Sequence, residues 1–207
     1  MTTVKRRVLG TLVRQFGHPR GSTGQVVGWV MAHRRSNRER NRWVVGLLDV
    51  QPTDTVLEIG FGPGLAIAEL ARRAGHVHGI DRSDVMVRQA SRRNRVAVAE
   101  GRVELVHASV DRLPRFDAPL DAVMAVNSVG FWPEPAQRLR ELWGLLRPGG
   151  RIALASQPRC PGATRDTTDR AAGELRALLA GAGFAELRVE TLELDPPVAC
   201  VLGVRPR

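Results

Sequence analysis

The sequence predicts an α/β fold in which N-terminal helices precede a doubly wound, mostly parallel sheet. From about residue 52, short apolar runs alternate with segments of helical spacing, and the links between runs are long enough for crossover connections. The run Asp121–Val126 is almost entirely apolar, which is typical of a strand covered on both faces. A chain of 207 residues can bury a sizeable core in one such domain.

Each apolar run is a predicted strand. In chain order these are Thr55–Ile59, His76–Ile80, Val103–His107, Asp121–Val126, Arg151–Ser156, Glu186–Leu192 and Val198–Val204. Helices are predicted between them at Leu65–Ala74, from Ser83 to about Asn94, at Pro135–Leu145 and from about Asp166 to Leu179. Ser83 suits a helix N-cap, and Pro135 suits a first helical position. We therefore expect a helical arm over residues 1–50 and a sheet domain over residues 51–207.

The composition excludes several classes of protein. Hydrophobic residues make up 43% of the chain and charged residues 25%, which excludes a wholly disordered protein. No apolar run approaches the roughly 18 residues of a membrane span. Two cysteines are too few for a disulfide framework or a zinc cluster, and no metal site is predicted. A cytoplasmic protein is expected.

Positive charge is concentrated at the start of the chain. Residues 1–42 contain ten basic residues and one acid, whereas the remaining residues are nearly neutral. Three interpretations stay open: a solvated lid enriched in arginine by codon bias, a surface for an anionic small molecule or phospholipid, or an RNA-binding arm. An aromatic content of 4% argues against RNA, because stacking residues are scarce.

A glycine-rich turn follows the first predicted strand. Gly60, Gly62 and Gly64 alternate directly after Glu58-Ile59. A dinucleotide fingerprint would need glycine or alanine at the position of Leu65, so that motif does not fit. Asp81 ends the second strand, where a carboxylate can accept hydrogen bonds from both hydroxyls of a ribose. The pattern predicts a nucleoside site.

With these residues in place, the sequence resembles the class I S-adenosylmethionine-dependent methyltransferases of the small-molecule type. The resemblance covers residues 52–156 well and 157–207 more loosely. Its matching segments are residues 58–64, Gly79-Ile80-Asp81-Arg82-Ser83, Leu113-Pro114, Asp121-Ala122-Val123, Leu146-Arg147-Pro148-Gly149-Gly150 and Gly181-Ala182-Gly183-Phe184. The resemblance implies a Rossmann-like sheet of seven strands with the last one antiparallel. It also implies S-adenosyl-L-methionine as cofactor and a small, aromatic or amphiphilic methyl acceptor.

The resemblance assigns cofactor-binding roles to residues at the strand ends. Gly60 and Gly62 would lie against the methionine part, Glu58 would orient its amino group, and Asp81 would bind the ribose. The other cofactor-binding residues implied are Met86, Ser109, Val110 and Asn127. Ala108 stands where relatives often have an acid, so adenine recognition would rest on Ser109 or backbone groups.

Substrate-binding residues are expected on the arm and in the loop after the fourth strand. Residues 24–49 have helical spacing, and an apolar stripe there includes Asn37 and Asn41, which could face the ligand. A helix break at Ser36-Asn37 is the open alternative. Phe131 and Trp132 would form an apolar wall.

The sequence offers little for acid–base chemistry and leaves the acceptor open. Relatives that act on quinones or acyl chains often carry a histidine after the fourth strand, and this chain has none there. His33 is the one histidine kept as a candidate general base, whereas His76 and His78 are interpreted as structural. The alternatives are methylation of phospholipid head groups or RNA through the arm, and a non-catalytic cofactor-binding relative.

Overall fold

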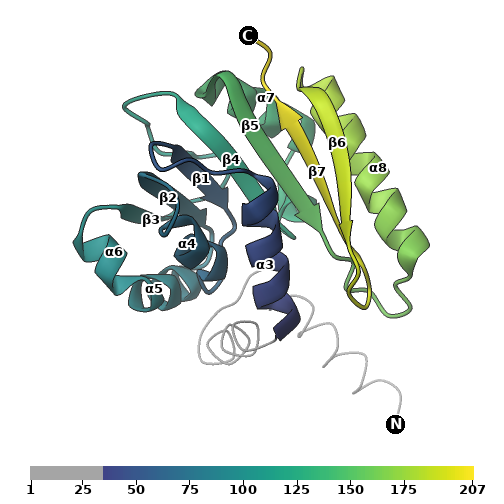
Figure 1. Ribbon diagram of the computed structural model, residues 1–207, viewed down its shortest axis with the longest axis horizontal. Coiled ribbons are helices and arrows are strands. Elements are labelled where there is room, and N and C mark those ends of the chain that lie inside the picture. The colour runs from purple at the N-terminus through teal and green to yellow at the C-terminus, as the bar shows by residue number, and fades with distance from the viewer. Residues whose placement is uncertain (1–34) are drawn as a thin grey trace.

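A seven-stranded sheet forms the centre of the structure, a computed structural model that describes residues 35–207 (Figure 1). Its strands are β1 Thr55–Ile59, β2 His76–Asp81, β3 Val103–His107, β4 Leu120–Val126, β5 Leu146–Ser156, β6 Ala185–Leu192 and β7 Val198–Val204. They are ordered β3-β2-β1-β4-β5-β7-β6. Neighbours among β1 to β5 pair in parallel, and β7 pairs antiparallel with both β5 and β6. The predicted fold class, including the antiparallel last strand, is confirmed.

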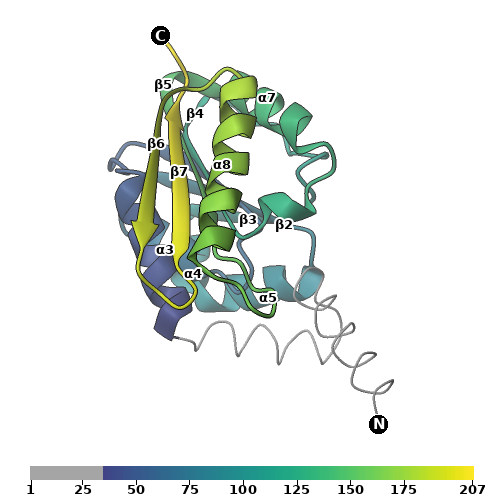
Figure 2. The ribbon, with the colours of Figure 1, turned by 90° about the vertical axis from the view of Figure 1, so that its right-hand side faces the viewer.

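Helices cover both faces of the sheet. They are α3 Arg35–Leu47, α4 Leu65–Leu70, α5 Asp84–Arg93, α6 Arg95–Ala99, η1 Val129–Phe131, α7 Pro135–Leu145 and α8 Arg165–Gly181. The helices α3 to α6 contribute to one hydrophobic cluster, and η1, α7 and α8 contribute to another. In Figure 2, α8 lies on one side of β7 and α3 on the other.

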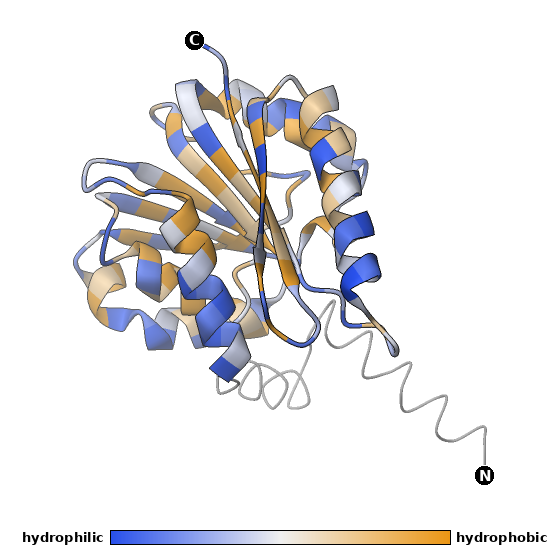
Figure 3. Cartoon of the chain, turned by 45° about the vertical axis from the view of Figure 1, so that its right-hand side comes forward, coloured by the Kyte–Doolittle hydropathy of each residue, from blue (hydrophilic) through white to orange (hydrophobic). Residues whose placement is uncertain are grey.

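Alternation along β4 separates these two clusters. Ala122, Met124 and Val126 pack with the cluster of α3 to α6, whereas Val123 and Ala125 pack with the cluster of α7 and α8. Figure 3 shows the same pattern as apolar strands between helices whose outer faces are polar. Burial on both faces explains the apolar run that predicted β4.

Two predicted boundaries differ from the structure by four or five residues, the others differ by at most two, and α6 and η1 were not predicted. The helix predicted at Leu65–Ala74 ends at Leu70, because the chain turns there and the N–H groups of Gly75 and His76 both donate to the carbonyl of Asp54. The fifth strand starts at Leu146 rather than Arg151, because Leu146 already pairs with Leu120 before a register shift. Neither difference moves the carboxyl ends of the strands.

The helix α3 packs on the sheet through one continuous stripe. Its buried residues, with Leu48 beyond its end, follow the i, i+3, i+4 spacing of a helix face: Asn37, Arg40, Asn41, Val44, Val45 and Leu48. Ser36 and Asn37 lie inside the helix, so neither caps it. Because Val44 and Val45 belong to the core cluster, this part of the expected arm packs as part of the domain. The lid role of residues 1–50 stays a prediction.

Arg151 at β5 holds the end of α3 against the sheet. Its Nε donates to the carbonyl of Leu48 at 3.0 Å, and its Nη2 pairs with the buried carboxylate of Asp54. Asp54 also accepts the N–H of Gln51 at 2.8 Å. One guanidinium therefore joins α3, β5 and the start of β1. Within residues 35–207, no helix has the length and apolar character needed to cross a bilayer.

Replacing Arg151 with leucine should lower the free energy of unfolding by about 3 kcal/mol, because the Asp54 carboxylate would stay buried without its cation. The matched control is Arg147→Leu on the same strand, whose partner Asp121 is less buried. That change should cost under about 1 kcal/mol. Urea unfolding of both variants checks the difference, and equal losses would contradict this role of Arg151.

Candidate functional site

The turn after β1 is tied to both neighbouring strands. The Gly60 N–H donates to the carbonyl of Ile80 at 2.8 Å, and the Ser128 hydroxyl donates to the carbonyl of Ile59 at 2.7 Å. Gly60 has a φ of +77°, and a Cβ on it would lie 2.6 Å from the Cβ of Ser128. Only glycine therefore fits at this position. The space beside Gly60 is filled by Ser128 and is not open to a ligand.

The other two glycines of the turn have different surroundings. A Cβ on Gly64 would lie 2.7 Å from the Cβ of Ala90, so this glycine lets α5 approach the turn. A Cβ on Gly62 would meet nothing within 4 Å. Gly62 is therefore the glycine whose backbone faces space that a ligand can occupy.

Asp81 lies against this turn at the end of β2. One carboxylate oxygen accepts the N–H of Gly62 at 2.9 Å, and the other accepts the N–H of Ser83 at 2.9 Å. The residue is buried, and burial raises the pKa of Asp81 although both backbone N–H groups lower it. A carboxylate accepts about four hydrogen bonds, so both oxygens keep acceptor capacity for a ligand.

Glu58 is a second acid in the same region, on β1. Its side chain is 2% exposed, and its Oε2 has no hydrogen-bond partner among the described residues. Burial, followed by the nearby charge of Asp81, raises the pKa of Glu58 to about 8. A buried acceptor without a partner is unfavourable and marks a place where a donor group is missing.

Asn127 ends β4 with a left-handed φ of +56°. Its N–H donates to the carbonyl of Ala155 at 2.8 Å, and its Oδ1 accepts the N–H of Gln157 at 2.7 Å. The amide of Asn127 is thus fixed between the ends of β4 and β5. Its predicted place beside the reacting group of the cofactor stays a prediction.

The residues predicted to contact adenine lie on α5 and in the loop after β3. Met86 and Val110 are core residues with 2% and 4% exposure. Ser109 is half-buried and hydrogen-bonds Asp111, which lowers the pKa of that acid. Their contacts with a cofactor stay predictions.

The two predicted aromatic wall residues differ in burial. Trp132 is 9% exposed and packs in the cluster of α7 and α8, so most of its surface is in the core. Phe131 is 52% exposed, and the guanidinium of Arg82 lies 5.3 Å from its ring centroid. Because Arg82 follows Asp81, this contact joins the loop after β4 to the end of β2.

The inner stripe of α3 brings polar side chains to the end of β5. Asn37 and Asn41 are both buried, and the Asn41 side chain donates to the carbonyl of Asn37 at 2.7 Å. Arg40 lies between them and donates to Gln157 at 2.8 Å, while Arg159 donates to Asn37 Oδ1 at 2.6 Å. Sequence reasoning missed Arg40, Gln157 and Arg159. The available signal was that Arg40 shares the helical stripe of the two asparagines.

The histidines show contacts of different kinds. His33 lies outside the described residues. The rings of His76 and His78 are 4.5 Å apart at their centroids, and His78 Nδ1 lies 3.0 Å from a carboxylate oxygen of Glu104. His107 ends β3, and its Nε2 lies 3.0 Å from the carbonyl of Arg82.

The edge formed by Glu58, Gly62 and Asp81 suits a ligand with a diol and a cationic amine. A ribose diol could donate to the free acceptor sites of Asp81, and an ammonium could donate to Glu58. The backbone at Gly62 leaves room between them. These are the groups that a nucleoside joined to an amino acid carries.

Comparison with known proteins agrees with this geometry. The family described as "Methyltransferase domain" matches residues 56–150, which include most of β1, all of β2 to β4 and the glycine turn. The uncharacterised methyltransferase YdaC of Bacillus subtilis (strain 168) is 29% identical over 184 residues, covering 87% of this chain and 98% of YdaC. A demethylmenaquinone methyltransferase of Clavibacter sepedonicus is 36% identical over 110 residues, covering 52% of this chain and 44% of that enzyme.

Among solved structures, the N-methyltransferase NodS from Bradyrhizobium japonicum WM9, in complex with S-adenosyl-L-homocysteine, has the same fold. It matches with a TM-score of 0.70 and 16% identity, over 86% of this chain and 92% of NodS. The family match, the relative matched along its length, the shared fold and the glycine turn beside two buried acids lead to one conclusion. They support a class I S-adenosylmethionine-dependent methyltransferase.

Proposed function

We propose that this enzyme transfers the methyl group of S-adenosylmethionine to a small, aromatic or amphiphilic acceptor. The observation that carries the proposal is the pair of buried acids around Gly62, with Asp81 bonded to the turn and Glu58 lacking a partner. The name of the Clavibacter relative, which gives demethylmenaquinone as its acceptor, supports an aromatic acceptor for this chain.

The proposed roles are those that the resemblance implies, and the contacts of these residues support them. Asp81 binds the ribose hydroxyls, and Glu58 accepts hydrogen bonds from the amino group. Asn127, held by Ala155 and Gln157, orients the end of β4 toward the reacting centre. When bound, S-adenosylmethionine supplies a methyl group already activated on a sulfonium, so positioning and exclusion of water can suffice without a general base.

The acceptor would lie between α3 and the loop after β4. Half-exposed Phe131 offers an aromatic surface on one side, and the polar stripe with Asn37 and Asn41 offers amides on the other. Trp132 supports this loop from within the core rather than by a large exposed surface.

The proposed function is tested by calorimetry and by a screen of acceptors. S-Adenosylhomocysteine should bind and NAD should not, because the turn lacks the dinucleotide spacing. Methyl transfer to members of a small-molecule library is then detected as S-adenosylhomocysteine by mass spectrometry. Binding of NAD without S-adenosylhomocysteine would overturn the proposal.

Asp81→Ala should weaken S-adenosylhomocysteine binding by about 1–3 kcal/mol, because hydrogen bonds from the ribose to a carboxylate are lost. The matched control is Asp84→Ala, three residues away on the exposed side of α5, which pairs only locally with Arg88. Calorimetric affinities of both variants check this expectation. Equal affinities for Asp81→Ala and the unaltered protein would place the ribose elsewhere.

Glu58→Gln should remove part of the pH dependence of stability in the ligand-free enzyme. The pKa of Glu58 is raised from 4.5 to about 8 in the folded protein, so the folded state holds a proton that the unfolded state loses between those pH values. Stability from this group is complete below pH 4.5 and falls as pH rises towards 8, by up to about 1.4 kcal/mol per pH unit. Thermal unfolding from pH 5 to 9 measures the slope for both proteins.

A slope that is the same with glutamate and with glutamine would contradict a buried, protonated Glu58. The same variant tests the role proposed for the amino group. S-Adenosylhomocysteine should bind Glu58→Gln more weakly than the unaltered enzyme, since the ammonium loses an ionisable partner.

A further inference from the structure

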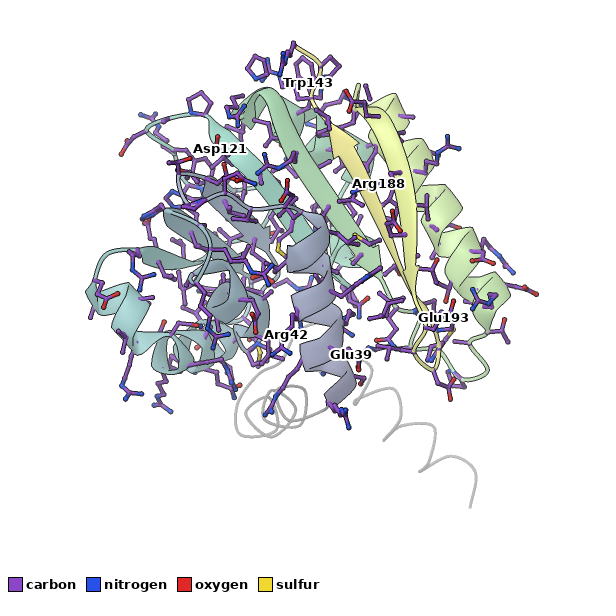
Figure 4. All side chains as sticks on the ribbon, in the orientation of Figure 1. Glu39, Arg42, Asp121, Trp143, Arg188 and Glu193 are labelled. Atoms are coloured by element: carbon purple, nitrogen blue, oxygen red, sulfur yellow. The ribbon has the colours of Figure 1, made fainter. Side chains whose placement is uncertain are left out.

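Arg40 is a buried cation on the inner stripe of α3. It is 4% exposed, and its Nη1 donates to the side-chain oxygen of Gln157 at 2.8 Å. Its Nε is buried without a hydrogen-bond partner among the described residues. On the same helix, Glu39 and Arg42 are exposed (Figure 4). Burial of Arg40 is therefore specific to its place on the stripe.

The chain provides no carboxylate for this guanidinium. No ion pair of the described residues includes Arg40. Residues 1–34 contain neither aspartate nor glutamate, so that segment cannot supply a side-chain carboxylate either. Burial, followed by the positive charge of Arg159, lowers the pKa of Arg40 to about 9.

Such an arrangement is unfavourable in the ligand-free protein. A pKa of about 9 leaves Arg40 charged at neutral pH. A buried charge is tolerated when it is paired, and removing one partner of a buried pair is strongly destabilising. An anion from outside the chain would complete the pair. The planar fork of arginine matches carboxylate and phosphate groups in particular.

Arg40 is connected to the proposed active site through one residue. Gln157, which accepts from Arg40, donates its backbone N–H to the Oδ1 of Asn127 at the end of β4. Arg159, two residues further along, reaches back to Asn37 on α3. Two guanidiniums and two asparagines thus lie beside the strand ends where the ligands are proposed to meet.

We propose that Arg40, with Arg159 beside it, binds an anionic oxygen group, carboxylate or phosphate, of a ligand in this site. The location as a ligand site rests on the proposed function. Two sources share this chemistry: the carboxylate of the cofactor's amino-acid part, and an acidic group on the methyl acceptor. Under the second source, the acceptor is an anionic small molecule.

The test compares Arg40→Gln with Arg42→Gln, an exposed arginine on the same helix whose side chain is 68% exposed. Calorimetry measures the affinity of S-adenosylhomocysteine and of its decarboxylated analogue. If the anionic group is the carboxylate of the cofactor, Arg40→Gln should lower the affinity for S-adenosylhomocysteine at least about tenfold. The affinity for the decarboxylated analogue should not change. Arg42→Gln should leave both affinities unchanged.

If the acceptor is the source, S-adenosylhomocysteine affinity should stay constant in both variants. Inorganic phosphate or benzoate should then bind the unaltered enzyme loaded with S-adenosylhomocysteine, and Arg40→Gln should lose that binding. Arg159 is exposed, so Arg159→Gln should fold normally and should weaken binding of the same anion. This variant replaces Arg40→Gln in the test if Arg40→Gln does not fold.

Thermal unfolding separates ligand binding from a structural role. Without ligand, Arg40→Gln should unfold at the same or a higher temperature than the unaltered enzyme, since an unpaired buried charge is removed. Ligand affinities of Arg40→Gln that equal those of Arg42→Gln would overturn the proposal, as would a lower unfolding temperature with unchanged binding. Failure of the unaltered enzyme to bind S-adenosylhomocysteine would instead contradict the proposed function.

Discussion

The hydrogen bond from the Gly62 amide to the Asp81 carboxylate is the interaction on which the candidate site depends. It joins the turn after β1 to the end of β2, beside the backbone bond from Gly60 to Ile80. Without it, the turn would lose one of the hydrogen bonds that hold it over the strand ends, and Asp81 would lose an N–H that lowers its pKa. The orientation of the Asp81 carboxylate, which is proposed to bind the ribose, therefore follows from this bond together with the Ser83 N–H on its other oxygen.

Two of the four buried side-chain atoms that lack a hydrogen-bond partner among the described residues belong to Glu58 and Arg40, close to strand ends of the candidate site. Glu58 keeps an unpaired oxygen, and Arg40 keeps an unpaired Nε. Each is unfavourable for the folded state alone, and each lies near a strand end rather than at a remote surface. Proteins commonly give up stability in this way at sites that bind ligands. The two groups also carry opposite preferences, one for a donor or cation and the other for an anion, as an amino acid moiety would provide.

Local sequence features predicted most of the fold, because each strand and helix carries its own signal. Apolar runs marked the strands, Ser83 marked the start of α5, and Pro135 marked the start of α7. The early start of β5 was not predictable, since it depends on pairing between Leu146 and Leu120. The glycine turn and Asp81 were predicted together because their spacing reflects one strand–helix–strand unit, in which Asp81 ends the second strand.

The polar stripe on α3 was only partly predictable from local sequence features. Its periodicity put Asn37 and Asn41 on the buried face, but an arginine is expected to reach solvent, so Arg40 was assigned to the charge of the arm. Arg40 is buried where α3 packs on the sheet, and there it donates to Gln157, which lies 117 residues further along the chain. Only the packing of α3 beside β5 brings them together.

The most direct test of the account is a crystal structure of the enzyme with S-adenosylhomocysteine. The account predicts that the ribose hydroxyls lie within hydrogen-bonding distance of Asp81 and that the amino group lies at the oxygen of Glu58 that now lacks a partner. The ligand would pass over Gly62, where the backbone leaves space. A complex in which the nucleoside lies away from Asp81, or in which Glu58 stays without a polar contact, would contradict it.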